Sequence, residues 1–91
     1  MNSFSTRNFS CASFLLFALG DAALVSTVAD GPPVYTFEGA RCHELSKQFF
    51  ADGSVTVGDA RALLECSRLI RQTAMAARNS PGHMWIRGDA T

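Results

Sequence analysis

Residues 48–64 read QFFADGSVTVGDARALL, and they contain the turn around which the folded part of the chain is predicted to form. Within this stretch, Asp52-Gly53 is a dipeptide typical of tight turns. Apolar residues recur at helical spacing on both sides of it, which predicts one helix over 38–50 and a second over 57–78. Two helices joined by so short a connection pack antiparallel, as a helical hairpin.

The apolar spacing on each side of the turn supports this prediction. The residues that recur at steps of three and four are Cys42, Leu45 and Phe49 before the turn, and Ala60, Leu63, Leu64, Ile70, Ala74 and Ala77 after it. Thr56 followed by Asp59 is a variant of the capping box, which marks the start of the second helix. The predicted fold is therefore mainly α: a small hairpin of two antiparallel helices after an N-terminal apolar targeting helix. Residues 34–37 are β-prone and could add one short strand.

The N-terminal segment has the composition of a targeting sequence. Residues 1–20 contain no acid and a single base, Arg7, and an apolar run over 14–19 is followed by small residues. This pattern predicts a secretory signal peptide over 1–22 and a secreted or periplasmic protein. The alternative is a membrane anchor over 11–29, in which Asp21 would cost about 2.5–3.5 kcal/mol near the bilayer centre.

The remaining chain divides at breaker residues. The turn signal Asp30-Gly31-Pro32-Pro33 separates the predicted hairpin from the chain before it, so that residues 23–37 are expected to be a linker with a short extended segment. The hairpin domain is expected over 38–79, because Asn79-Ser80-Pro81-Gly82 stops the second helix. Residues 80–91 are expected to form a flexible tail.

Three cysteines, Cys11, Cys42 and Cys66, allow one disulfide prediction. Removal of a signal peptide would take Cys11 away and leave an even pair in a compartment where disulfides persist. Cys42 and Cys66 would each lie roughly 14–15 Å from the turn end of the hairpin, and so at the same height. A Cys42–Cys66 bridge closes a loop of about 25 residues, worth roughly 3.5 kcal/mol. The alternative is a pair of buried thiols.

Charge and motif content exclude several classes of function. Eight Lys and Arg residues balance eight Asp and Glu residues, so the basic excess needed for nucleic-acid binding is absent. Cys42 and His43 are sequence neighbours and would point in different directions on a helix, so they do not make a nucleophile–base pair. No zinc-finger spacing links the cysteines to His43 and His83. The sequence therefore predicts no enzyme, no cofactor and no metal site.

The turn region resembles half of a calcium loop of the EF-hand or dockerin type. The matching residues are Asp52, Gly53, Val55 and Asp59, and the loop again lies between two predicted helices. The resemblance implies that Asp52 and Asp59 would be the calcium ligands. Gln48 and Phe50 stand where that family places further oxygen ligands, so a degenerate calcium-binding module is the second alternative function.

The function predicted first is that of a small exported, non-enzymatic protein that binds another macromolecule, most simply a protein. Residues 61–91 hold five arginines against two acids, whereas 23–59 hold two bases against five acids, and such polarity suits docking. The candidate binding residues are Met84 and Trp85 in the tail and Arg68 and Arg71 on the second helix. The first alternative is a small single-pass membrane protein that retains residues 11–29.

Overall fold

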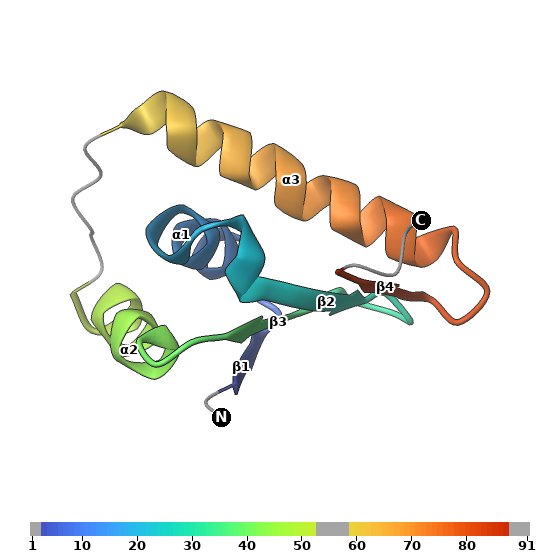
Figure 1. Ribbon diagram of the computed structural model, residues 1–91, viewed down its shortest axis with the longest axis horizontal. Coiled ribbons are helices and arrows are strands. Elements are labelled where there is room, and N and C mark those ends of the chain that lie inside the picture. The colour runs from blue at the N-terminus through green and yellow to red at the C-terminus, as the bar shows by residue number, and fades with distance from the viewer. Residues whose placement is uncertain (1–2, 53–58, 88–91) are drawn as a thin grey trace.

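Strand β3, Val34–Glu38, lies in the interior of a four-stranded antiparallel sheet with the order β1-β3-β2-β4 (Figure 1). The structure is a computed structural model, which describes residues 3–52 and 59–87. The other strands are β1 (Ser3–Thr6), β2 (Leu24–Val28) and β4 (Met84–Ile86). Strands β2 and β3 are rich in β-branched and aromatic residues, which suit a pleated sheet. The Asp30-Gly31-Pro32-Pro33 segment connects them, with Gly31 at φ 115°.

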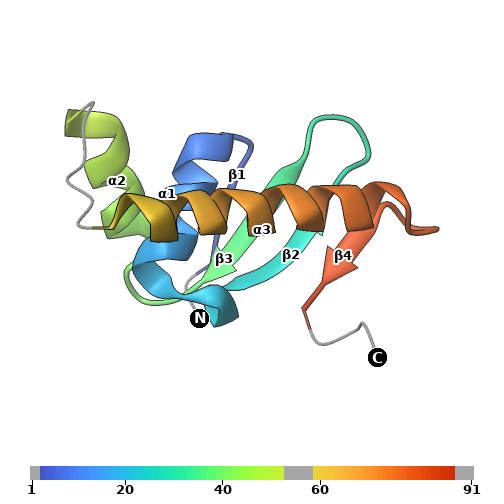
Figure 2. The same cartoon turned by 90° about the horizontal axis from the view of Figure 1, so that it is seen from above.

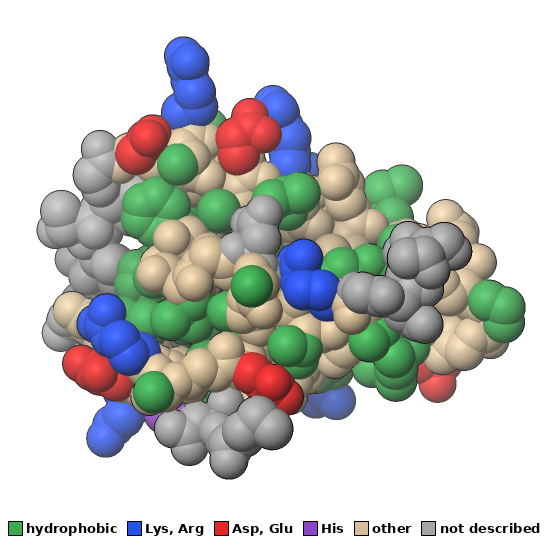
Figure 3. Space-filling view, viewed as in Figure 1, with side chains coloured by type: hydrophobic (Ala, Val, Ile, Leu, Met, Phe, Trp, Pro, Cys, Tyr) green, Lys and Arg blue, Asp and Glu red, His purple; other side chains and the backbone are tan. Residues whose placement is uncertain are grey.

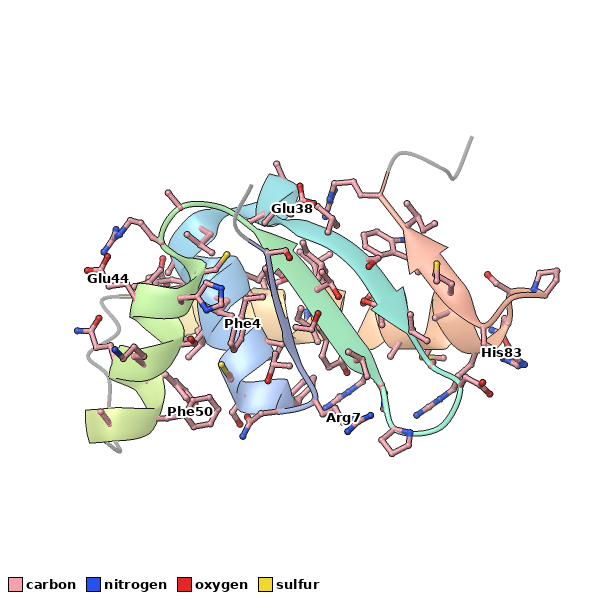
Figure 4. The ribbon with its side chains drawn as sticks, turned by 90° about the horizontal axis from the view of Figure 1, so that it is seen from below. Phe4, Arg7, Glu38, Glu44, Phe50 and His83 are labelled. Atoms are coloured by element: carbon pink, nitrogen blue, oxygen red, sulfur yellow. The ribbon has the colours of Figure 1, made fainter. Side chains whose placement is uncertain are left out.

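One face of this sheet belongs to the core. Leu24 pairs with Phe37, and Thr27 pairs with Tyr35 on one side and Trp85 on the other. Residues that face each other across antiparallel strands share a face, so all five side chains point to the same side. Four of them are buried and Trp85 is half-buried. The opposite face carries the alternate residues, and Figure 4 shows α1 and α3 behind the strands when that face is viewed.

Three α-helices accompany the sheet in the described part of the chain. They are α1 (Phe9–Leu19), α2 (Cys42–Asp52) and α3 (Ala60–Arg78), and a 3-10 turn, Asp21–Ala23, links α1 to β2. Helices α1 and α3 cover the inner face of the sheet, and α3 runs along the length of the molecule (Figures 1 and 2). Helix α2 packs against α1 and against β1.

Helix α1 is the centre of the hydrophobic core. Its side chains are apolar nearly all round, and a helix of that kind is stable only when it is buried. The buried α1 residues in the core cluster are Cys11, Ala12, Phe14, Leu15 and Leu16, and they pack with Leu24, Phe37 and Ile70. Asn8 caps the helix, since its side chain accepts a hydrogen bond of 2.9 Å from the Cys11 N–H. The segment with targeting composition thus supplies a large share of the core.

The expected mainly α helical hairpin is wrong. The fold is α/β with an antiparallel sheet, and α2 and α3 each pack against α1 instead of forming an antiparallel pair. The physical reason is that the hairpin prediction left residues 1–22 out of the folded domain and treated 23–37 as a linker with a short extended segment. In the structure these segments contain α1 and β2. Both elements pack against α3, so the apolar stripe of α3 contacts them and does not pair with α2.

Element boundaries also differ from those expected. Glu38 ends β3, so the first helix of the expected pair begins four residues later, at Cys42. The second begins at Ala60, and Asp59 caps it by accepting a 3.1 Å hydrogen bond from the Ala62 N–H. The expected capping residue Thr56 lies outside the described residues. Met84–Ile86, within the expected tail, form β4 and pair with β2.

Candidate functional site

A groove of about 340 Å³ between α3 and β4 is the candidate site. Its apolar surface comes from four elements of the fold: helices α1 and α3 and strands β2 and β4. The apolar lining residues are Leu16, Leu24, Leu69, Ala76 and Trp85. The volume lies at the lower end of the range of about 300–1,000 Å³ that is typical of ligand pockets. The groove therefore has room for one or two side chains of a partner, or for a small ligand.

Helical periodicity and one turn explain how the chain builds the groove. Leu69, Gln72, Thr73 and Ala76 follow one another at steps of three, one and three, and so line one side of α3. After α3, the segment 79–83 reverses the chain, with His83 at φ 53° and its N–H donating to the Ser80 carbonyl over 3.0 Å. This reversal places β4 beside β2 and turns Trp85 toward α3.

Arg87 is the charged residue of the groove. Its Nε donates to the Leu24 carbonyl oxygen over 2.7 Å, and its guanidinium lies 5.3 Å from the centre of the Trp85 ring. Among the described residues, no carboxylate pairs with Arg87, and none of the groove's lining residues is acidic. A guanidinium fixed beside an aromatic ring and apolar walls suits a carboxylate that adjoins an apolar group.

The other polar groups of the groove do not form a catalytic set. The Thr73 hydroxyl donates to the Ile70 carbonyl over 2.8 Å, so its only proton is already used. It therefore accepts from Thr27, whose Oγ1 lies 2.9 Å away. Gln72 adds an amide, and the lining residues that the structure describes include no His, Cys, Asp or Glu. Among the described lining residues, no nucleophile therefore has a neighbouring base.

The structure brings one of the four predicted binding residues into this groove. Trp85 forms a wall of it, and Met84, the preceding residue of β4, points to the opposite face of the sheet. Arg68 and Arg71 lie on α3 outside the groove. Arg68 forms an exposed ion pair of 3.2 Å with Glu65, and Arg71 lies over the Phe9 ring at 5.4 Å.

Sequence reasoning missed Arg87, Gln72 and Leu69. The signal for Arg87 was its position two residues after Trp85, which puts both side chains on one face if residues 84–86 are read as a strand. The prediction of a flexible tail over 80–91 does not use that signal. The α3 residues carried a weaker signal, since Gln72 and Thr73 interrupt the apolar stripe on the side of the helix that faces β4.

The cysteines do not lie where a helical hairpin with a Cys42–Cys66 disulfide would place them. Cys11 and Cys42 are buried in the core and Cys66 is half-buried on α3, and the described part of the chain contains no disulfide bond. Burial raises the pKa of the Cys42 thiol, and the nearby Glu38 carboxylate raises it further. Burial also raises the pKa of Cys11, although a hydrogen bond with Thr6 lowers it in part. A Cys42–Cys66 bridge stays a prediction for peptide mapping.

The predicted calcium ligands fall at the edge of the described chain. Asp59 serves as the N-cap of α3, and the Asp52 side chain and residues 53–58 of the expected loop lie outside the described residues. Within the ranges that the structure describes, no three His, Cys, Asp or Glu side chains come together as a metal site would require.

The expected anchor segment, 11–29, is divided among α1, the 3-10 turn and β2. Of the helices in the described ranges, none combines the length and the apolar character needed to cross a membrane. No family model matches the chain, and neither a curated protein nor a solved structure is significantly similar to it.

Proposed function

We propose that this protein is a small non-enzymatic binding protein that holds a segment of another protein in the groove between α3 and β4. The observation that carries the proposal is the composition of the groove: apolar walls, the Trp85 ring, and the Arg87 guanidinium, with no acid or base beside a nucleophile. Tryptophan and arginine are the residue types that most often dominate the energy of protein–protein contacts.

The exposed surface of α3 also supports binding to a protein. Helix α3 exposes four arginines, Arg61, Arg68, Arg71 and Arg78, against one carboxylate, Glu65. Leu64 and Met75 are 65% and 55% exposed on the same helix. Figure 3 shows charged side chains projecting along the side of the molecule where α3 lies, with hydrophobic atoms between them. Mixed basic and apolar surface of this kind favours an acidic protein partner.

A peptide display experiment on the full chain tests the proposal. Ala76 is exposed on the groove side of α3, so Ala76→Trp fills the groove without requiring a change in the core. Ala60→Trp is the matched control, because Ala60 is also exposed on α3 but lies about 24 Å farther along the helix. Peptides selected on the wild-type protein should bind Ala76→Trp at least about tenfold more weakly, equivalent to about 1.4 kcal/mol, and bind Ala60→Trp unchanged. Selection of no peptides, or equal binding to both variants, would contradict the proposal.

Export through a signal peptide over 1–22 stays a prediction, and it has a consequence for the groove. Leu16 lies within that segment and lines the groove, and α1 supports both Leu24 and α3. A protein that has lost residues 1–22 therefore lacks this groove, and the proposed binding belongs to the chain that retains them. The mass of the protein isolated from its native compartment decides which form exists.

A further inference from the structure

The outer edge of β4, beside the groove, has backbone groups that face away from the sheet. The Ala29 N–H donates to the His83 carbonyl over 2.8 Å, and the Arg87 N–H donates to the Val25 carbonyl over 2.9 Å. In an antiparallel ladder these bonds alternate along the strand, so His83, Trp85 and Arg87 direct their N–H and C=O groups toward β2. Met84 and Ile86 direct theirs outward, and no described strand follows β4 in the sheet order.

The other edge of the sheet is protected. His43 of α2 donates from Nε2 to the Ser3 carbonyl of β1 over 3.0 Å, and its ring meets the Phe4 ring edge-on at 5.5 Å. Figure 4 shows α2 beside this strand, with Phe4 pointing toward it. Natural sheets commonly block exposed edges in this way, because an open edge is a template for pairing with another chain. Among the described residues, β4 has no such cover.

The side chains of β4 define what an added strand would contact. Met84 and Ile86 are 43% and 44% exposed on the open face of the sheet, and Trp85 and Arg87 are on the groove side. A residue placed opposite Trp85 would point its side chain into the groove. In an antiparallel addition, the residue two positions earlier would face Arg87, and the residues opposite Met84 and Ile86 would cover those two side chains.

The charge of the groove and of α3 indicates which kind of segment would bind at the β4 edge. The groove offers a guanidinium with no acid among its described lining residues. The exposed surface of α3 as a whole carries four arginines against one carboxylate. Pairing of β4 with the same strand of a second copy would bring two arginine-rich α3 helices to the same side of a continuous sheet, and like charges oppose such an arrangement. An acidic segment of a different protein would form hydrogen bonds with the outward backbone groups of β4, and its carboxylates would be attracted to the positive surface.

We propose that β4 accepts an extended acidic segment of a partner protein as an added antiparallel strand. An apolar side chain of that segment fills the groove beside Trp85, and a carboxylate two residues before it pairs with Arg87. This inference rests on the proposed function and names the partner's conformation and chemistry.

The test uses two acetylated and amidated peptides with the full chain. One has the core Glu-Val-Leu-Val and the other has Lys in place of Glu. Trp85 is the only tryptophan of the chain, so its fluorescence reports occupation of the groove directly. We expect the Glu peptide to shift the emission of Trp85 to shorter wavelength and to bind about tenfold or more tightly than the Lys peptide, as loss of a charge-assisted contact predicts.

A charge exchange gives the matched control. Arg87→Glu should weaken binding of the Glu peptide and strengthen binding of the Lys peptide, and Lys47→Glu, the same change of charge on the exposed surface of α2, should do neither. Because Arg87→Glu also removes the hydrogen bond to Leu24, a second measurement leaves the protein unchanged. N-methylation of the peptide valine opposite Met84 should abolish binding, since it removes a donor from the new ladder. Hydrogen exchange should show that the Met84 and Ile86 amides become protected on binding.

The outcomes separate this inference from the proposed function. Equal binding of the Glu and Lys peptides, no effect of N-methylation, or no change in Trp85 emission would overturn the inference. If peptides selected by display still depend on Ala76, the groove binds proteins in another manner and only the added strand is refuted. If the Met84 and Ile86 amides are already protected in the concentrated protein alone, β4 pairs with a second copy, which also overturns the inference.

Discussion

Thr27 of β2 and Thr73 of α3 join the sheet to the helix through a buried hydrogen bond, and their roles are unequal. Thr73 donates its proton to the Ile70 carbonyl, so Thr27 donates to Thr73 and depends on it. Thr73→Val leaves the fully buried Thr27 hydroxyl without an acceptor, and we expect a loss of about 1–3 kcal/mol in the free energy of unfolding. Thr27→Val leaves Thr73 bonded to Ile70 and should cost less. Urea unfolding of both variants and of the double variant checks this order.

The double variant supplies the control for that prediction. With valine at both positions, no buried hydroxyl is left without a hydrogen-bond partner. The double variant should therefore be at least as stable as Thr73→Val alone. Equal costs for the two single variants, or strictly additive costs in the double variant, would contradict the assigned direction of the hydrogen bond.

The buried thiols make stability depend on pH in the alkaline range. Burial raises the pKa of Cys11 and of Cys42 in the folded protein above that of an unfolded cysteine, about 8.5. Above that pH the folded state keeps protons that the unfolded state loses. The contribution of the two protonated thiols to the free energy of unfolding is therefore complete below about pH 8.5, and it is lost as the pH rises through the folded pKa values. We expect the free energy of unfolding to fall as the pH rises above about 8.5 under reducing conditions. The variant with alanine at both cysteines should be less stable but show a smaller slope, and an unchanged slope would contradict the assignment.

At the scale of elements, local pattern and tertiary packing contribute to different parts of the fold. The helical spacing of Ile70, Ala74 and Ala77 and the extended character of 34–37 reappear as α3 and β3. Helix α1 could not be assigned in the same way, because an apolar run of its length suits both a signal peptide and a buried helix. Strands β1 and β4 are three or four residues long, and such short segments become strands only when a neighbouring strand supplies hydrogen-bond partners.

The candidate site was only partly predictable for the same reason. Trp85 could be chosen from the sequence because a large aromatic residue in a polar segment stands out. The groove beside Trp85 could not be predicted, because its lining residues come from α1, β2, α3 and β4. Only the chain reversal after α3 brings them together. Arg68 and Arg71 were chosen for their charge, and charge alone does not show which side of a helix faces a cavity.

The outward direction of the Ile86 N–H leads to a prediction for β4 that needs no ligand. Proline lacks an N–H, so it is tolerated on an edge strand where that group faces solvent and disrupts a strand that is paired on both sides. Ile86→Pro should therefore unfold at nearly the same urea concentration as Ile86→Ala. Thr36→Pro, in β3, which pairs with both β1 and β2, should cost about 3 kcal/mol or more. If Ile86→Pro destabilises the protein as much as Thr36→Pro, the Ile86 N–H belongs to the ladder and the β4 edge is not open.

At the scale of the whole molecule, the first and last parts of the chain depend on each other. Residues 3–6 supply the edge strand β1, and α1 separates α2 from α3 and packs on the sheet. The C-terminal strand β4 forms the opposite edge of the sheet, and Leu16 and Trp85, far apart in sequence, line the same groove. Loss of the N-terminal segment therefore removes the support of the binding groove as well as part of the core.

Removal of residues 1–22 should unfold the protein. Each of Phe14, Leu15 and Leu16 is buried, and burial of such a side chain contributes about 1.5–3 kcal/mol, against a total stability of about 5–15 kcal/mol for a typical domain. The chain beginning at Ala23 should lack the dispersed methyl and amide resonances of a packed core. As a control, the full chain carrying a protease site at the exposed Gly20 should keep its fold when it is cleaved after folding, because α1 remains packed between α2 and α3. A chain beginning at Ala23 that folds cooperatively and contains a Cys42–Cys66 disulfide would contradict this prediction, since it would show that the helices can form a stable domain without α1.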